Sequence, residues 1–78
     1  MSHTPHELAE EFPDRVEQMS KMKQSDAHFA KLFDEYHEIN RAVHRAETNI
    51  EPTDDLHMGE MRKTRLALKD EIWSMLLA

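Results

Sequence analysis

Pairs of histidine and carboxylate residues are the first candidates for chemistry in this sequence. The members of each pair lie three residues apart, in the pairs Asp34 and His37, His44 and Glu47, and His57 and Glu60. Residues at this spacing lie on one side of a helix, and di-metal helical bundles bind their ions through glutamate and histidine pairs that project into the core. A metal site therefore requires that these pairs converge on the interior, which depends on the elements that carry them.

Nucleophilic catalysis has less support in the residue types. The chain has no cysteine, which excludes disulfides, zinc–cysteine sites and thiol chemistry. Its serines lack the glycine context of a nucleophile elbow, and a single glycine cannot form a glycine-rich phosphate loop. We expect a protein that is not an enzyme.

The composition limits the class of protein further. The 78 residues include 16 acidic and 10 basic side chains, for a formal net charge of −6, which predicts no general attraction to nucleic acid or anionic membranes. No apolar run approaches the roughly 18 residues of a membrane span, and the first residues lack the pattern of a signal peptide. With so little glycine and proline, we expect an all-α protein. Because the sequence shows neither a membrane span nor the pattern of a signal peptide, we expect it in the cytoplasm without a membrane partner.

Sparse proline and glycine divide the chain, a single small helical domain over residues 1–78, into a few helices. We predict, in order, a short helix over about 5–12, a long helix over about 14–48, a turn at 49–53 and a last helix over about 54–77. The first helix begins with a capping box, Thr4 to Glu7, and ends at Pro13. The sequence leaves open whether the long helix is continuous through Ser25, because Ser25 and Asp26 can cap a new helix or lie inside one.

Apolar residues recur at alternating intervals of three and four along both long helices, which is the pattern of a coiled-coil seam. On the first of them the seam positions are Phe29, Leu32, Tyr36, Ile39, Val43 and Ala46. On the last helix they are Met58, Met61, Arg65, Leu68, Ile72 and Met75. The two helices are therefore predicted to pair as an antiparallel hairpin.

The turn near residue 52 sets the register of this hairpin, because facing residue numbers then sum to about 104. The predicted layers are Ala46 with Met58, Val43 with Met61, Ile39 with Arg65, Tyr36 with Leu68, Leu32 with Ile72, and Phe29 with Met75. The histidine and carboxylate pairs fall outside the seam, on the flanks and outer faces of the helices. We therefore expect no metal ion and no other cofactor.

A second set of apolar residues lies beside the seam, toward the end away from the turn. Its members are Phe12, Val16, Met19, Phe33, Leu66, Trp73 and Leu76. In the predicted register, residues before Asp26 extend past the end of the last helix and have no partner in the hairpin. A lone pair of helices buries too little apolar surface to offset its ordering entropy. We favour a homo-oligomer, a helical bundle, that buries this candidate oligomer or partner face, with an N-terminal helix folded back over Trp73 as the alternative.

A basic stripe from Arg62 to Lys69 carries four cations and no acid. It can contact phosphates, but in an acidic chain we prefer the interpretation that it balances the acidic block 47–60. Arg65 is the one polar residue of the seam. Either its stem packs on Ile39 while the guanidinium reaches Glu35 or water, or it specifies the register of the hairpin.

Two segments resemble the motifs of the YdcH-like family of small bacterial proteins. They are His28 to Asn40 (HFAKLFDEYHEIN) and Arg62 to Ile72 (RKTRLALKDEI), and the resemblance extends over residues 25–76. The resemblance implies a compact helical hairpin of unassigned function, with no catalytic residues to carry over.

The sequence supports two hypotheses on function. The first is a non-catalytic helical-hairpin interaction or regulatory module that self-associates and docks on an unidentified protein partner. The second, less favoured, is a nucleic-acid-associated accessory protein that uses the stripe Arg62–Lys69. A pull-down from lysate with and without nuclease separates the two.

Overall fold

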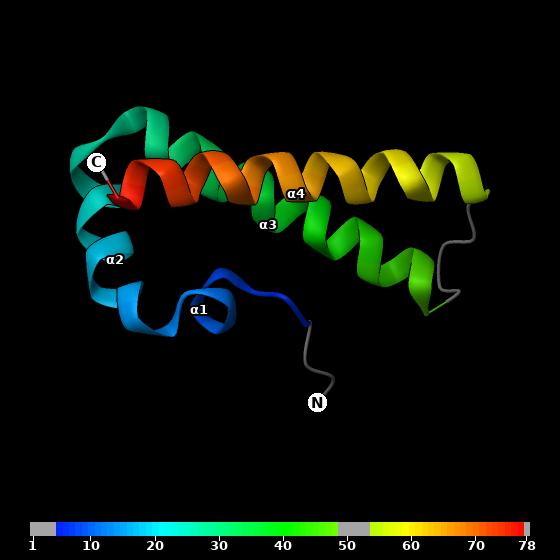
Figure 1. Ribbon diagram of the computed structural model, residues 1–78, viewed down its shortest axis with the longest axis horizontal. Helices are drawn as coiled ribbons and strands as arrows, with labels where there is room; N and C mark the ends of the chain where they lie inside the picture. Colours follow the sequence, from blue (N-terminus) through cyan, green and yellow to red (C-terminus); the bar gives the residue numbers. More distant parts are fainter. Residues whose placement is uncertain (1–4, 49–53, 78) are drawn as a thin grey trace.

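The structure, a computed structural model, describes residues 5–48 and 54–77, and in these residues the chain is all-α without a strand. The elements are α1 (Leu8–Glu11), a short 3-10 helix η1 (Pro13–Arg15), α2 (Val16–Ser25), α3 (Ala27–Glu47) and α4 (Asp55–Leu77). Figure 1 shows α3 and α4 as the two long helices, with α2 turning back beside the end of α4 and α1 lying below α3. None of the described helices combines the length and hydropathy that crossing a membrane requires.

The chain leaves the helical conformation between α2 and α3 because the backbone at Asp26 is extended, with φ −130° and ψ 107°. The Asp26 carboxylate accepts hydrogen bonds from the amides of His28 and Phe29, at 3.0 and 3.1 Å. It thereby satisfies two of the donors that a first helical turn leaves without partners. The helix is therefore not continuous through Ser25, and the break lets α2 double back along α3.

The first helix begins at Leu8, later in the chain than the capping box predicts. His6 has a left-handed backbone (φ 63°), which a helix cannot continue through. The carbonyls of Pro5 and His6 accept hydrogen bonds from side chains of α3 instead of from helical amides. Thr4, the first residue of the predicted capping box, lies outside the described residues.

The last helix is capped by Asp54, whose Oδ1 accepts from the amide of His57 at 2.7 Å. The predicted turn at 49–53 lies outside the described residues. At the other end of α4, the Leu76 carbonyl accepts from Gln18 Nε2 of α2 at 2.9 Å. Because the last carbonyls of a helix lack partners within it, Gln18 satisfies one of them and ties α2 to α4.

Helices α3 and α4 pack against each other and run in opposite directions. The contact partners fall along α4 as they rise along α3, in the pairs His28 with Glu71, Asn40 with Arg65, and Glu47 with Arg62. Of the predicted seam, the buried residues are Phe29, Leu32, Tyr36, Val43, Ala46, Met61 and Ile72. The half-buried ones are Ile39, Met58, Arg65, Leu68 and Met75. The pairing within single layers stays a prediction.

Residues before Asp26 have partners within the chain, contrary to the expectation of an unpaired overhang. We call residues 5–25 the N-terminal arm. Leu8 and Met19 of the arm are buried in one apolar cluster with Phe29, Leu32, Tyr36, Ile72 and Leu76. The Phe12 ring stacks on Trp73, with centroids 5.0 Å apart and planes at 18°. The structure therefore contains the alternative, an N-terminal arm folded back over Trp73. The break at Asp26 reverses the direction of the chain, and the periodicity of the apolar residues does not predict this reversal.

A smaller apolar cluster lies toward the other end of α3 and α4. Its buried members are Val43, Ala46 and Met61, with Ile39, Ala42 and Met58 packed against them. The N-terminal arm contributes to the first cluster and not to this one. The arm thus builds a core at one end of the helix pair only.

Candidate functional site

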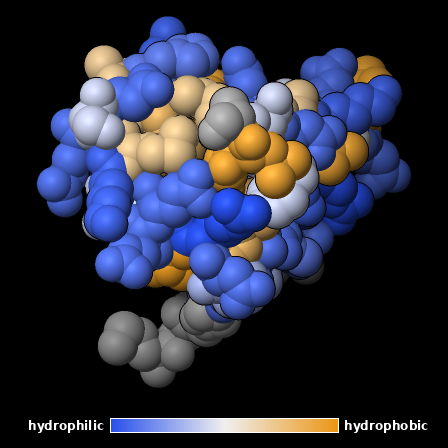
Figure 2. Space-filling model, turned by 60° about the vertical axis from the view of Figure 1, so that its left-hand side comes forward, coloured by the Kyte–Doolittle hydropathy of each residue, from blue (hydrophilic) through white to orange (hydrophobic). Residues whose placement is uncertain are grey.

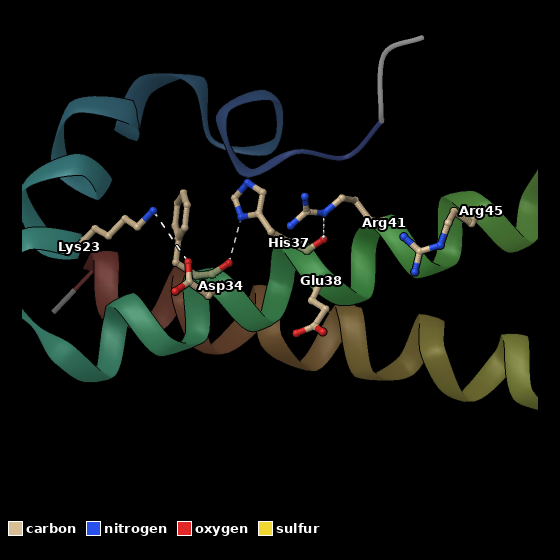
Figure 3. A pocket seen from close by; sticks show the side chains of 7 residues that line it. Lys23, Asp34, His37, Glu38, Arg41 and Arg45 are labelled. Atoms are coloured by element: carbon tan, nitrogen blue, oxygen red, sulfur yellow. Dashed lines mark hydrogen bonds and ion pairs between the residues drawn. The ribbon is translucent and has the colours of Figure 1, made fainter.

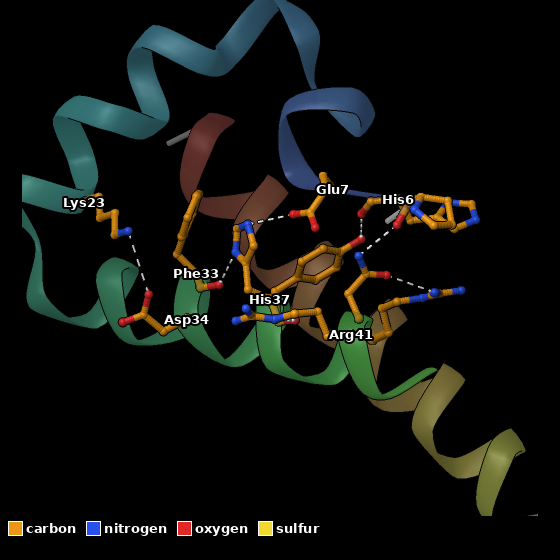
Figure 4. A network of polar contacts seen from close by, with 11 residues as sticks. His6, Glu7, Lys23, Phe33, Asp34, His37 and Arg41 are labelled. Atoms are coloured by element: carbon orange, nitrogen blue, oxygen red, sulfur yellow. Dashed lines mark hydrogen bonds and ion pairs between the residues drawn. The ribbon is translucent and has the colours of Figure 1, made fainter. Parts of the chain in front are cut away.

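Polar side chains of α3 attach the N-terminal arm (Figure 4). His37 Nε2 lies 2.8 Å from Glu7 Oε2, and His37 Nδ1 lies 3.0 Å from the Phe33 carbonyl oxygen. Both neighbours of the ring can accept hydrogen bonds, so whichever ring nitrogen carries a proton has an acceptor within reach. Because both ring nitrogens are engaged, His37 holds the arm and presents no open nitrogen to a metal or substrate.

Two buried side chains of α3 hold the backbone of the arm. The Tyr36 hydroxyl donates to the His6 carbonyl at 2.6 Å, and Asn40 Nδ2 donates to the Pro5 carbonyl at 2.8 Å. Asn40 Oδ1 also accepts from Arg65 Nη1 at 3.1 Å. One amide side chain therefore joins the arm, α3 and α4.

We call Tyr36, His37 and Asn40 the polar anchor. The seam pattern includes Tyr36 but not Asn40, which among the described residues is the one buried residue with an amide or charged side chain. Asn40 follows Phe33 by seven residues, and this heptad spacing on the apolar flank is the signal that could have found it. The sequence does not reveal that an arm covers this flank.

The Tyr36 hydroxyl is the one group in the described residues with a clearly displaced pKa. The pKa of Tyr36 is raised from 10.0 to about 12, chiefly by burial; the negative charges of Glu11 and Glu7 also raise it, and the positive charge of Arg65 lowers it. The folded protein therefore holds this proton more tightly than the unfolded chain does. The resulting stabilisation is complete below pH 10 and is lost as the pH rises toward about 12.

Tyr36→Phe tests this linkage. We expect the free energy of unfolding to fall less steeply between pH 10 and about 12 in the variant than in the parent, because phenylalanine has no proton to release. At neutral pH the variant should be less stable by about 1–2 kcal/mol, since the His6 carbonyl loses its donor. Urea unfolding at a series of pH values measures both effects, and equal slopes in the alkaline range would contradict the assignment.

A broad, open groove of about 630 Å³ runs along α3 beside this anchor (Figure 3). It is lined by Lys23, Phe33, Asp34, His37, Glu38, Arg41 and Arg45. Lys23 Nζ lies 3.8 Å from Asp34 Oδ1 and 4.6 Å from the centroid of the Phe33 ring, so α2 closes one end of the groove through an ion pair and a cation–π contact. Arg41 Nε donates to the His37 carbonyl at 3.3 Å. The lining carries three cations, Lys23, Arg41 and Arg45, and two carboxylates, Asp34 and Glu38, so its charges largely offset one another.

The histidine and carboxylate pairs of the sequence analysis do not converge. Their contacts are to other residues, with Asp34 near Lys23, His37 near Glu7 and Glu47 near Arg62. His44 is half-buried on α3, and His57 and Glu60 are exposed on α4. Within residues 5–48 and 54–77, no three histidine, aspartate or glutamate side chains gather in a way that can hold a metal ion.

Comparison with known families identifies the helix pair. The family model described as "Protein of unknown function (DUF465)" matches residues 29–76, which is well over half of the 78 residues. This chain belongs to the DUF465 family. The YdcH-like resemblance of its motifs is consistent with this family. No curated protein and no solved structure matches the chain.

The DUF465 match begins at Phe29, after the N-terminal arm, and covers nearly all of α3 and α4. Tyr36, His37 and Asn40 lie inside the matched residues, whereas their partners in the arm lie outside them. The polar anchor therefore joins the family's helix pair to a segment that the family model does not cover.

The candidate oligomer or partner face is only partly exposed in this DUF465 protein. Met19 and Leu76 are buried, and Phe12 and Phe33 are half-buried. The exposed members are Val16, Leu66 and Trp73. The reason is that the docked arm covers much of the flank that was predicted to bind another molecule.

The basic stripe of this DUF465 protein also makes contacts within the chain. Arg62 Nη2 lies 3.0 Å from Glu47 Oε2, and Lys69 Nζ lies 3.7 Å from Glu11 Oε1. Arg65 donates to Asn40. It does not pair with Glu35, the acceptor that one interpretation predicts, and Glu35 instead lies 4.0 Å from Lys31.

Proposed function

We propose that this DUF465 protein is a non-catalytic interaction module that self-associates through the outer side of α4. One observation carries the proposal, which is that the large exposed apolar side chains of α4 lie on a single stripe. They are Leu56 (76% exposed), Leu66 (53%), Trp73 (37%) and Leu77 (58%). With Gly59, Lys63 and Asp70 they recur at alternating intervals of three and four, the spacing of a helix that faces another helix. We call these seven residues the α4 stripe.

The surface around the end of α4 supports an apolar contact there. Figure 2 looks onto the end of the molecule where α2 meets the end of α4, and hydrophobic side chains gather there among hydrophilic ones. Contiguous apolar surface of this kind marks an interaction site more often than single exposed residues do. The predicted seam already occupies the opposite side of α4, so a second contact on the stripe would make α4 an inner helix of a bundle.

Charge complementarity favours a second copy of the chain as the occupant. Lys63 and Asp70 both lie on the α4 stripe, and neither forms an ion pair with another described residue. If two α4 helices pair antiparallel about an axis beside Leu66, Lys63 of one copy faces Asp70 of the other, and Leu56 faces Leu77. Two-fold symmetry forms each contact twice. No atom of another described segment lies within 4 Å of the position that a Cβ atom on Gly59 would occupy, which leaves room there for the Trp73 ring of the second copy.

Leu66→Asp tests the proposal at the centre of the stripe. We expect the dimer to dissociate at least about tenfold more readily, because a carboxylate would be buried against its own symmetry mate. Analytical ultracentrifugation over a concentration series measures the dissociation constant. Val16→Asp is the matched control, since Val16 is similarly exposed (46%) but lies on α2. A monomeric parent protein, or an equal loss in both variants, would contradict the proposal.

Exchanging the two charges of the stripe tests the antiparallel arrangement itself. Lys63→Asp and Asp70→Lys should each weaken self-association, because each sets like charges opposite each other. The double variant restores the opposite charges, so we expect its dissociation constant to return toward that of the parent. Failure of the double variant to recover, with both single variants weakened, would rule out this pairing.

The alternative of nucleic-acid contact draws less support from the contacts of the basic stripe. Arg62, Arg65 and Lys69 are each directed at a residue of the same chain. Of the four cations, only Lys63 has no ion pair or side-chain hydrogen bond with another described residue, and we assign it to self-association. Partners that are captured from lysate and lost on nuclease treatment would favour nucleic acid instead.

A further inference from the structure

A small cavity of about 270 Å³ lies between the N-terminal arm and α4. It is lined by His6, Glu11, Tyr36, Arg62, Arg65, Leu66 and Lys69. The Tyr36 residue, whose hydroxyl donates to the His6 carbonyl, lines the cavity, as do His6 and Glu11, so the docked arm builds one side of it. The space accommodates a small ion with some of its water. The cavity exists only while the arm is docked.

Arg65 is the wall residue whose charge is least compensated. Its Nη1 donates to Asn40 Oδ1 at 3.1 Å, and among the described residues no carboxylate pairs with it. Asn40 is itself fixed by the Pro5 carbonyl, so the guanidinium is held in place before any ligand arrives. A guanidinium has five N–H donors in a planar fork. Among the described residues only Asn40 accepts from this guanidinium, so the other donors can serve an anion.

The charges of the wall define the class of anion. Three cations, Arg62, Arg65 and Lys69, face one carboxylate, Glu11, whose Oε1 is shared by His6 at 3.0 Å and Lys69 at 3.7 Å. Arg62 also pairs with Glu47, which lies outside the cavity wall. A positive excess of one to two charges remains. Phosphate at neutral pH carries about −1.5 to −2 and presents several acceptor oxygens.

We propose that this cavity binds a small phosphate anion, either inorganic phosphate or the terminal phosphate of a phosphomonoester. Arg65 donates hydrogen bonds to two phosphate oxygens through its planar fork, and Arg62 and Lys69 contact the remaining oxygens. All residues of the site come from one chain, so it forms without self-association, although Leu66 belongs both to the cavity wall and to the α4 stripe. Bound phosphate also links the arm to α4 and so stabilises the docked arm.

Isothermal titration calorimetry with inorganic phosphate, and separately with phenyl phosphate, tests the proposal at an ionic strength held constant with chloride. We expect one anion per chain. Arg65→Gln should weaken binding by about tenfold or more, because the fork is lost. Glu11→Gln should strengthen it, because the only carboxylate of the wall is removed. Lys31→Gln and Glu17→Gln are the matched controls, since they make the same changes of charge on α3 and α2 away from the cavity.

The outcomes separate the site from general attraction to anions. Opposite effects of the two cavity variants, with little effect of the two controls, support the proposal. Equal effects of variants and controls, no saturable binding at millimolar phosphate, or binding of an oligonucleotide without binding of phosphate would overturn it. If circular dichroism shows that Arg65→Gln is unfolded, Lys69→Gln takes its place. NMR shifts at His6, Tyr36 and Arg65 of the parent protein then locate the bound anion.

Discussion

Replacing Leu8 with alanine is expected to lower the free energy of unfolding by about 2–4 kcal/mol, a large share of the stability of so small a domain. Leu8 is fully buried, although it belongs to a four-residue helix and precedes the residues that the DUF465 model matches. The loss follows from its place in the cluster that Phe29, Tyr36 and Ile72 share, because truncation leaves a cavity between the arm and both long helices.

Urea unfolding measures this loss, and Trp73 reports where it occurs. Trp73 is the single tryptophan of the chain and stacks on Phe12 of the arm, so its fluorescence follows docking of the arm. Val16→Ala is the control, because it also removes apolar carbons from the arm but at an exposed position off the α4 stripe, and it should change stability by no more than about 0.5 kcal/mol. If Leu8→Ala were as mild as Val16→Ala, the arm would not be part of the folded core.

Asn40→Ala is expected to lower the free energy of unfolding by about 2–4 kcal/mol, through hydrogen bonding rather than apolar packing. Asn40 is 1% exposed and both ends of its amide are used. Alanine would leave the Pro5 carbonyl without its donor and the Arg65 guanidinium without its acceptor, both in a partly buried setting. The penalty for unsatisfied buried polar groups exceeds the net gain of an ordinary hydrogen bond.

Chemical denaturation of Asn40→Ala beside Glu38→Ala tests this expectation. Glu38 lies two residues away on α3 and is exposed, so its truncation should have little effect. Combining Asn40→Ala with Arg65→Gln gives a double-mutant cycle, in which the two losses should not add because both remove the same contact. Additive losses would mean that Asn40 and Arg65 are not coupled.

The periodicity of the apolar residues predicts which side chains are buried wherever burial depends on the pattern of a single helix. Phe29, Leu32 and Tyr36 recur at helical intervals, and burial of that face is favoured whatever else the chain does, because it removes apolar surface from water. The same pattern predicts the all-α class. Local chemistry likewise supplies the cap at Asp26, although the sequence allows that residue inside a helix as well.

Contacts between distant segments are what the sequence did not predict. Nothing in the sequence around Asn40 distinguishes it from an ordinary helix residue. Its role depends on the Pro5 carbonyl, 35 residues earlier in the chain, to which its side chain donates a hydrogen bond. The sequence predicts a surface for another molecule that includes Phe12, Met19 and Leu76. Their spacing shows that they need an apolar partner but does not show whether that partner is another molecule or the chain's own arm. The apolar flank that the sequence predicts includes Leu66 and Trp73 of the α4 stripe but not Leu56 and Leu77.

The amino-acid sequence is enough to predict the helical class, the apolar faces of α3 and α4, the lack of thiol chemistry and the acidic balance of charge. These properties follow from residue types and short spacings along one helix. The docking of the arm is seen only in the folded chain, where the arm's carbonyls accept hydrogen bonds from Tyr36 and Asn40 and Arg65 lines a cavity. The physical reason is that an extended residue at Asp26 reverses the chain, and the burial gained after that reversal depends on surfaces far apart in the sequence.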